Sequence, residues 1–519
     1  MVLQVPAPAP LCSAIQRWIV PASLIALCGG ILVASFLKSD WANNDFERFN
    51  DLRLLFLFFA LFAGLCAVYV AAYRLRLEVS PRALAATTAV SSLLLLAAFP
   101  VGSKDIFAYS FFGKLWGLYH KNPYIVTLAD VPADPWQPFV QARWRNLPAA
   151  YGPVFLWQAR AIYVLTTEHL WAAVWLHKAV ATSLLFASLW LARALLRSTA
   201  PDVTRWSSRG CAPATAPPGC SPSARSGRAV ATALTTGWCE RAQPRAPSWQ
   251  LVLLAWNPLL PFESANGGHN DIAMVLLLLG ALECWRRRRP TAASGLLALS
   301  IWYKWYGIIF VPAFLLETFK ADGWRAASRQ ATVWVAFTLL AGMIFLGPLP
   351  GSWPAVLGQL MHPGAMTGIY ITELSPPLAA CFWTLKAFGL FDSAWGVRLF
   401  DAARVTLFVV AAVLILVRQW TAAPSLAALV ESCCLFACAF FLLLITMLLP
   451  WHLLSAIVLG LVAGREPFLL AAVVLTVLAL LSYFLTFAVA TLMLGVVLGA
   501  LWLLRHSQTV MVRAVSGGG

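Results

Sequence analysis

The stretch LRLLFLFFALFAGLCAVYVAAY runs from Leu52 to Tyr73 and decides the fold class of this chain. Its length matches the roughly 20 apolar residues that cross about 30 Å of hydrocarbon as an α-helix. The acidic segment 38–51 precedes it, and Arg74 follows it directly. An apolar run of this length with a basic end is typical of a transmembrane helix whose basic end faces the cytoplasm.

Comparable apolar runs recur along all 519 residues, of which 61% are hydrophobic and only 11% are charged. This composition excludes a soluble globule. In a bilayer the backbone must satisfy its own hydrogen bonds, so we expect an all-α polytopic membrane protein of about 12–14 transmembrane helices. To within a few residues, the predicted helices are 18–37, 52–73, 83–100, 171–195, 249–262, 271–285, 292–303, 306–319, 330–347, 398–418, 426–448, 452–464, 467–484 and 486–504.

Basic residues at the helix ends predict how the chain threads the membrane, because cytoplasmic loops carry an excess of Lys and Arg. These residues are Arg74, Arg76 and Arg82, the run from Arg193 to Arg245, Arg286 to Arg289, Lys320, Arg325 and Arg329, and Arg505 and Arg513. One topology puts all of them inside, with both termini in the cytoplasm and the protein in the plasma (inner) membrane. Segments 38–51, 101–170, 263–270 and 348–397 then lie outside. The net charge of +16 is explained by these helix ends, so we expect membrane lipids and no nucleic acid as partners.

Two segments break the pattern of spans. The apolar run 151–165 is short, and a span there would put the basic loop outside, so we interpret it as an interfacial helix with Pro153 in its first turn. The stretch 202–248 is rich in Pro, Ser, Ala, Arg and Gly without a period, which predicts disorder. The expected division is a cytoplasmic N-terminus (1–17), three transmembrane helices (18–100), an external loop with interfacial helices (101–170), a transmembrane helix (171–195), a disordered cytoplasmic loop (196–248), the remaining transmembrane helices (249–504) and a cytoplasmic tail (505–519).

The cysteines indicate neither disulfides nor zinc. None of the eleven forms a CxxC or a Cys/His ligand spacing. Six lie in or at the ends of apolar runs: Cys28, Cys66, Cys284, Cys433, Cys434 and Cys438. We expect no cofactor. A carboxylate beside water could hold Mg²⁺ or Mn²⁺, but one carboxylate per loop is a poor site by ligand count.

The first polar constellation opens the long external loop. Asp105 follows an apolar run, and cations and aromatic residues stand near it in sequence: Lys104, Tyr109, Lys114, Lys121, Tyr124, Arg143, Arg145 and Tyr151. An ionised Asp at the outer end of a helix could take a proton from a hydroxyl nucleophile, while the cations hold a phosphate leaving group. The alternative is that Asp105 caps a helix beginning at Ile106.

The second constellation runs from Asn257 to Asp271, between two apolar runs and on the same predicted face as Asp105. Its glycines would let the backbone approach a ligand closely, and His269, Asn270 and Asp271 suit sugar hydroxyls or a pyrophosphate-like group. The alternative is a hairpin turn in which Asp271 caps the next helix.

The third constellation is Trp302-Tyr303-Lys304-Trp305-Tyr306. Lys304 could clamp a phosphate, because a lysine is a mobile point charge that pairs with phosphate oxygens. It could equally be a snorkelling lysine anchored in an aromatic belt. For Pro450-Trp451-His452 and His362-Pro363 we expect interfacial packing.

The order Asp105-Ile106-Phe107-Ala108-Tyr109, Asn122-Pro123-Tyr124, Tyr151-Gly152-Pro153, Asn257-Pro258, Gly268-His269-Asn270-Asp271 and Lys304 resembles a known family. It is similar to the polyprenol-phosphate-mannose-dependent mannosyltransferases of the GT-C glycosyltransferase fold, particularly the bacterial α-1,6-mannopyranosyltransferases, over roughly residues 50–460. The resemblance implies a GT-C-like bundle with a large external loop. It also implies an inverting enzyme that moves a hexose, mannose in this family, from a polyprenyl-phosphate sugar to a glycan or glycolipid acceptor on the outer face.

In such enzymes an Asp in the first large external loop is the essential carboxylate, and the resemblance carries that role to Asp105 as general base. The substrate-binding residues expected beside it are Lys104, Tyr109, Lys114, Arg143, Arg145, Tyr151, Asn257, His269, Asn270, Asp271 and Lys304. This chain departs from the family pattern because Asp105 follows the third predicted helix rather than the first, and because of the stretch 202–248.

Other functions stay open at this point. A lipid or glycolipid transporter or flippase would carry charged residues within its spans. The candidates for such residues are Lys178, Glu283 and Lys386, and they form no evident pair. A non-catalytic scaffold would tolerate substitution of Asp105 and Asp271 together.

Overall fold

The computed structural model describes residues 10–37, 51–199, 248–361, 374–391, 393–486 and 489–492. Every regular element in these residues is a helix, and they include no strand. Six of the described helices are long and apolar enough to cross a membrane, and three shorter apolar ones accompany them. The chain is therefore an all-α polytopic membrane protein, as predicted. The expected total of about 12–14 spans stays a prediction.

The helices have the following bounds. They are α1 (Pro10–Leu37), α2 (Leu52–Arg74), α3 (Pro81–Ala97), α4 (Asp105–Gly117), η2 (Leu128–Asp130), η3 (Gln137–Phe139), α5 (Ala142–Arg145), α6 (Pro153–Thr166), α7 (Leu170–Thr199), α9 (Ser248–Ala255), α10 (Leu259–Pro261), η4 (Phe262–Asn266), α11 (Asp271–Arg286), α12 (Pro290–Tyr303), η5 (Trp305–Phe310), α13 (Val311–Asp322), α14 (Trp324–Leu346), α15 (Ser352–Met361), α17 (Pro376–Ala387), α18 (Ala394–Thr421), α19 (Leu426–Ala439), η7 (Phe440–Leu444), η8 (Pro450–Leu453), α20 (Leu454–Ala463) and α21 (Glu466–Leu481).

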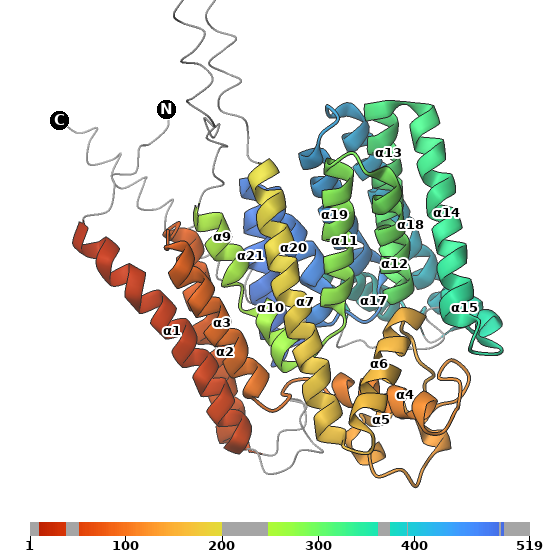
Figure 1. The fold of residues 1–519 in the computed structure, drawn as a ribbon, viewed down its shortest axis with the longest axis horizontal. Coiled ribbons are helices and arrows are strands. Elements are labelled where there is room, and N and C mark those ends of the chain that lie inside the picture. The colour runs from red at the N-terminus through yellow and green to blue at the C-terminus, as the bar shows by residue number, and fades with distance from the viewer. Residues whose placement is uncertain are drawn as a thin grey trace, which may run out of the picture.

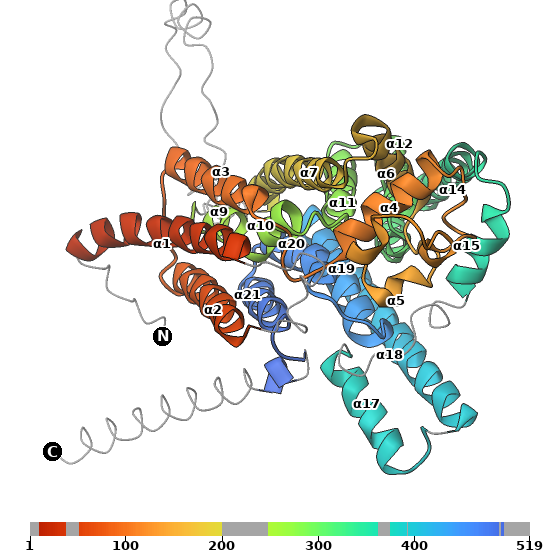
Figure 2. The ribbon, with the colours of Figure 1, turned by 90° about the horizontal axis from the view of Figure 1, so that it is seen from below.

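The long helices run side by side, and α4, α5 and α6 gather at one end of the bundle, the lower end in Figure 1. The turn between α13 and α14 lies at the opposite end. Seen from below in Figure 2, α1, α2 and α3 stand together on one side and α17 and α18 project on another. Helix α11 contacts α7, α12 and α20, so it lies inside the bundle, and its first residue belongs to the site described below.

The loop between α3 and α7 is a packed substructure with its own apolar core. Residues of α4 and α6 form one buried cluster with the start of α7 and the end of α12. Helix α6 begins at Pro153, as predicted for this segment. Its neighbour Gly152 lies against α12, where a Cβ atom would stand 2.0 Å from the carbonyl oxygen of Trp302. The Tyr-Gly-Pro motif therefore allows a close contact between the loop and the bundle.

The prediction of one helix over 249–262 is wrong. Helix α9 ends at Ala255, and the chain turns at Asn257 before α10. The reason is local: Pro258 has no N–H to donate, and the Asn257 side chain accepts from the backbone N–H groups of Leu259 at 3.1 Å and Leu260 at 3.2 Å.

Several other helix bounds also differ from the prediction. Helix α3 ends at Ala97 rather than near 100, because Pro100 disfavours helical backbone at Phe99. Helix α14 begins at Trp324, six residues before the predicted start. Helices α15 and α17 lie within the predicted external segment 348–397.

Some predictions fall outside the described residues. They concern the chain before residue 10, the segments 38–50 and 200–247, His362-Pro363, most of the predicted helix 486–504, and the tail 505–519. The division of the chain into cytoplasmic, membrane and external segments remains a prediction.

Candidate active site

The start of α4 meets the turn that leads into α11. Gly268 in that turn has a φ of +64°, and a Cβ atom there would lie 2.5 Å from Cδ1 of Ile106. A side chain at position 268 would therefore be strained and would also push against the residue next to Asp105. The structure brings together the first two polar constellations, as predicted.

Hydrogen bonds hold the connection between α3 and α4 against the segment that leads into α11. The Asn266 side chain accepts from the N–H of Val101 at 3.0 Å and donates to the carbonyl oxygen of Phe99 at 2.8 Å. Lys178 of α7 donates its Nζ to the carbonyl oxygen of Ala98. The approach to Asp105 is thus held from two sides by residues far away in sequence.

Asp105 is the first residue of α4, and Lys104 occupies the N-cap position without a side-chain capping bond. The Asp105 N–H donates to Oγ of Ser103 at 3.2 Å. The alternative interpretation, in which Asp105 caps a helix beginning at Ile106, is therefore wrong, since the helix begins at Asp105 itself. A carboxylate in a first turn is favoured by the positive end of the helix dipole. Asp105 is only 4% exposed.

Tyr109, one turn further along α4, reaches the second constellation. Its hydroxyl lies 3.2 Å from Nδ1 of His269, and Nε2 of the same ring lies 3.4 Å from Oε2 of Glu263. The remaining oxygen of Glu263 accepts from the Tyr483 hydroxyl at 2.9 Å. These buried side chains bring together polar atoms from α4, from the turn with η4 and from the segment that follows α21.

Burial shifts the pKa values of Tyr109 and His269 in this group of side chains. It raises the pKa of Tyr109 well above its ordinary value, and the charges of Tyr151, Asp105 and Asp271 add to the effect. Burial also lowers the pKa of His269 well below its ordinary value, with Lys304 contributing. A neutral imidazole has one N–H, so the tautomer decides which of Tyr109 and Nδ1 donates. Nε2 lies near Oε2 of Glu263 without a hydrogen bond between them.

Trp451 is a neighbour of the site that the sequence did not indicate. Its ring stacks on His269 with centroids 3.8 Å apart and planes 13° apart. We expected Pro450-Trp451-His452 to pack at the interface, because a Trp near the end of an apolar run has that role most often. Only the position of η8 beside the turn shows that Trp451 fixes the orientation of the His269 ring.

Lys304 pairs with the first residue of α11. Its Nζ lies 2.6 Å from Oδ2 of Asp271 and 3.3 Å from Oδ1 of Asn270. The other oxygen of Asp271 accepts from the Tyr306 hydroxyl at 3.2 Å. Asp271 is completely buried, whereas the Lys304 side chain remains 12% exposed. The third constellation thus joins the second, and its cation is the part that reaches the surface.

Other predicted cations are engaged within the loop. Nζ of Lys114 lies 2.8 Å from Oδ2 of Asp134 and 2.7 Å from Oε2 of Glu168. Arg145 donates to the carbonyl oxygens of Val140 and Pro138. These contacts stabilise the loop, and neither cation reaches the turn through them. The side chain of Arg143 lies outside the described residues.

Asn257 and Tyr151 hold parts of the fold together. The amide nitrogen of Asn257 donates to the Tyr69 hydroxyl at 3.0 Å and to Oγ1 of Thr476 at 2.8 Å. The Tyr151 ring packs edge-on against Tyr109, with centroids 5.1 Å apart. Asn257 therefore links α2, α10 and α21, whereas Tyr151 lines the side of α4 that faces the site.

The part of the chain that the structure describes contains no group of three or more His, Cys, Asp or Glu side chains that could hold a metal ion. Asp271 instead pairs with Lys304 and accepts from the Tyr306 hydroxyl, and Glu263 accepts from the Tyr483 hydroxyl. The chemistry of this donor set suits proton transfer and anion binding.

Two family models match the chain. The model described as Alpha-(1->6)-mannopyranosyltransferase, N-terminal domain, matches residues 20–208, which include Asp105 and Tyr109. The model described as Glycosyltransferase family 87 matches residues 226–446, which include His269, Asp271 and Lys304. No curated protein matches the chain.

The all-α membrane bundle and these matches define the class of the protein: it is a membrane glycosyltransferase. More particularly, the two matches support a GT-C mannosyltransferase-like family.

Proposed function

We propose that this protein transfers a hexose, specifically mannose, from a polyprenyl-phosphate sugar to a glycan or glycolipid acceptor on the outer face of the membrane, with inversion at the anomeric carbon. The observation that carries the proposal is the meeting of the α4 start, at Asp105, with the turn that presents Asp271, the partner of Lys304. A carboxylate and a cation at one end of a membrane bundle suit the transfer of a sugar from a lipid phosphate.

Asp105 acts as the general base. Its carboxylate accepts the proton of an acceptor hydroxyl, whose oxygen attacks the anomeric carbon from the face opposite the phosphate. One C–O bond forms to the acceptor, and the C–O bond to the phosphate breaks. The polyprenyl phosphate departs with the electron pair, and the configuration at the carbon inverts.

Lys304 and Lys104 stabilise the departing phosphate, because negative charge develops on its oxygens during the reaction. The N-termini of α4 and α11 both lie at the site, and their dipoles add positive potential there. Lys304 is already held by Asp271, so its ammonium group is positioned before the donor binds. His269, Asn270 and Tyr109 then form the wall against which the sugar is oriented.

We further propose that the site faces away from the cytoplasm of the plasma (inner) membrane and that both termini are cytoplasmic. The charge distribution supports this orientation. The basic turn Arg286–Arg289 ends α11, whose first residue is in the site, so the basic residues and the site lie at opposite ends of one helix. The positive-inside rule then places the site outside.

A transporter function has less support, because of the contacts that the charged residues of the spans make. Lys178 donates to the carbonyl oxygen of Ala98, and Glu283 pairs with Arg286 and Arg287 at the basic end of α11. Neither residue faces an opposite charge in the middle of a span, as a coupled transporter site would require.

The test is transfer of radiolabelled mannose from polyprenyl-phosphate mannose by purified protein in lipid nanodiscs, with acceptors extracted from the host membrane. Asp105→Asn should lower the rate by about 10² to 10⁴ while the protein still inserts and purifies as a single species. Asp130→Asn is the matched control, because Asp130 is an exposed carboxylate of the same loop that only bonds to Thr127. We expect no cofactor requirement, so transfer should persist in EDTA. Equal rates for wild type and Asp105→Asn would remove this carboxylate from the mechanism.

A further inference from the structure

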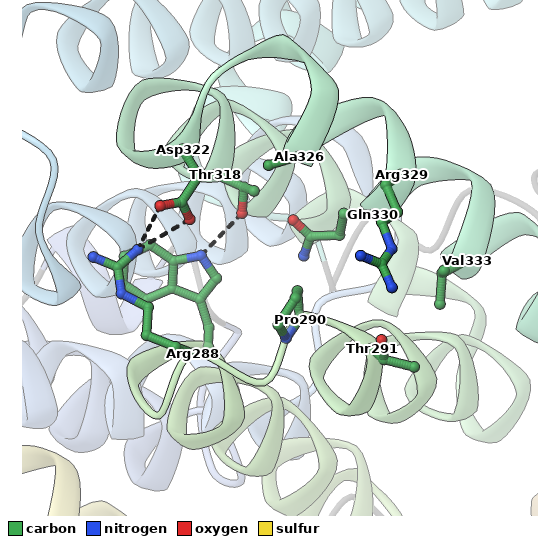
Figure 3. Close-up of a pocket in the computed structure, with 10 residues that line it drawn as sticks. Arg288, Pro290, Thr291, Thr318, Asp322, Ala326, Arg329, Gln330 and Val333 are labelled. Atoms are coloured by element: carbon green, nitrogen blue, oxygen red, sulfur yellow. Dashed lines mark hydrogen bonds and ion pairs between the residues drawn. The ribbon is translucent and has the colours of Figure 1, made fainter.

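A cavity of about 280 Å³ lies at the end of the bundle opposite the site, between the α11–α12 turn and the α13–α14 hairpin (Figure 3). Helix α11 spans the 16 residues from Asp271 to Arg286, so a rise of about 1.5 Å per residue separates the cavity from the site by about 24 Å. The cavity therefore belongs to neither the donor nor the acceptor region of the proposed reaction.

The charges around this cavity are predominantly positive. Arg288 and Arg329 approach it from opposite sides (Figure 3). The carboxylate of Asp322 also lines it and holds NH1 of Arg288 at 2.9 and 3.0 Å. Arg329 forms no ion pair with any of the described residues. Arg329 is exposed at the rim of the cavity and has no acidic partner among the described residues, which leaves its guanidinium available to an anion.

Two further features supply hydrogen-bond donors for an anion. Gln330 is only 4% exposed, and its amide points into the cavity (Figure 3). Its Nε2 is the donor that an anion can use, whereas its buried Oε1, an acceptor, is the atom without a hydrogen-bond partner. Helix α12 begins at Pro290, and Thr291 in its first turn lines the same space. A buried amide oxygen without a partner is rare and calls for a donor, such as a hydroxyl of a bound headgroup. The N-terminus of α12 adds the favourable end of the helix dipole for an anion.

The surroundings indicate where the anion comes from. Trp324, in the turn between α13 and α14, is 72% exposed, as expected for a Trp at the level of lipid headgroups. Trp285, Pro290 and Val333 give the cavity apolar walls. Its volume falls just below the range of pockets that enclose a drug-sized ligand, so it fits a headgroup whose acyl chains remain in the bilayer.

We propose that this cavity binds the phosphate group of an anionic phospholipid from the leaflet at the basic end of the bundle. Arg329, Nε2 of Gln330 and the first turn of α12 donate to the phosphate oxygens, and Arg288 remains paired with Asp322. Basic pockets between membrane helices on the cytoplasmic side suit anionic headgroups for this electrostatic reason. The bound lipid joins the α11–α12 hairpin to the α13–α14 hairpin.

Native mass spectrometry of the full chain in detergent, titrated with phosphatidylglycerol or with phosphatidylcholine, tests the proposal. Arg329→Ala should weaken phosphatidylglycerol binding by about tenfold or more, as loss of a charged hydrogen bond predicts. Gln330→Leu should weaken it by a smaller factor. Arg325→Ala is the matched control, because it removes the same charge from the first turn of α14 without lining the cavity. Phosphatidylcholine should bind all variants weakly and equally.

An equal loss of phosphatidylglycerol binding in Arg329→Ala and Arg325→Ala would overturn the proposal, because it would reflect only the overall surface charge. Unchanged binding in both arginine variants would overturn it as well. Adding inorganic phosphate distinguishes the two sources of the anion. Retention of the lipid at millimolar phosphate supports the headgroup, whereas release of lipid from wild type alone supports the same phosphate site occupied by the free anion. Because transfer activity is not the readout, this test is independent of the proposed reaction.

Discussion

The hydroxyl of Tyr109 lies 3.2 Å from Nδ1 of His269, although 160 residues separate the two in sequence. Both side chains are completely buried. The contact joins the external loop to the turn before α11, and so it couples the helix that begins with Asp105 to the turn that presents Asp271. A buried polar contact of this kind leaves little freedom to either partner, since an unpaired polar group in the interior is costly.

Tyr109→Phe should therefore lower stability and the transfer rate moderately, without abolishing activity. Losing this hydrogen bond should cost about 0.5–1.5 kcal/mol of stability and should lower the transfer rate less than Asp105→Asn does. Thermal unfolding in detergent and the nanodisc transfer assay measure the two effects. Tyr119→Phe is the control, since it removes a hydrogen bond to Asp134 within the same loop. Similar rate losses in both variants would show that the contact with His269 has no special role.

Gly268→Ala should separate α4 from the turn. The φ of +64° disfavours a side chain, and the new Cβ would meet Cδ1 of Ile106 at 2.5 Å. We expect a cost of about 1–2 kcal/mol from the backbone conformation alone, with a further loss of transfer because Asp105 is displaced. Ile106→Val removes the clashing atom, so the double variant Gly268→Ala/Ile106→Val should regain part of the activity. It should keep the loss of stability that comes from the backbone conformation. A double variant as inactive as Gly268→Ala alone would argue against the clash as the cause.

The pair Lys304 and Asp271 should behave as a buried ion pair. Lys304→Met leaves the carboxylate of Asp271 buried without its cation, which should cost about 3–5 kcal/mol. The double variant Lys304→Met/Asp271→Asn should lose less than the sum of the two single changes, because the charge has gone as well. Thermal unfolding in detergent gives this coupling. The surface pair Arg76 and Glu466, whose side chains are 62% and 54% exposed, is the control, and Arg76→Met should change stability little. Additive losses at the buried pair would contradict the expectation.

Asn257→Leu should lower the stability of the protein rather than change its binding of substrate. It leaves the N–H groups of Leu259 and Leu260 without the side-chain acceptor and removes the donor to Tyr69 and Thr476. We expect a stability loss of about 1–3 kcal/mol, with KM for the donor unchanged in the protein that remains folded. A raised KM with unchanged stability would instead support the earlier expectation that Asn257 binds substrate.

Much of the fold could be predicted from local signals. The helix beginning at Leu52 starts where the Asp51 side chain accepts from the N–H groups of Arg53 and Leu54, and it ends at Arg74, one residue beyond the predicted end. Each long apolar run is stable in lipid because of its own length and composition. Its position can therefore be predicted without knowing which helices pack against it. The break at Asn257 was missed because it depends on a side chain that bonds to its own backbone and to two distant helices.

The candidate site could be predicted only as a set of motifs on one side of the membrane. Lys114 and Lys304 are equally plausible phosphate ligands in the sequence, yet the first pairs with Asp134 and Glu168 while the second pairs with Asp271. Trp451 carried no signal beyond that of an interfacial aromatic. Which cation stays available depends on which acids are its neighbours in space, and spacing along the chain does not contain that information.

By itself, the sequence determined that this protein is a helical membrane bundle, and it predicted polar motifs at one end and the basic helix ends at the other, because hydrophobic length and charge act residue by residue. Only the tertiary structure decided that Tyr109 touches His269, that Gly268 packs on Ile106 and that Lys304 rather than Lys114 joins the acids of the turn. Such pairings depend on the rotation and register of helices packed against one another, and these are set by the fit of all the buried side chains together.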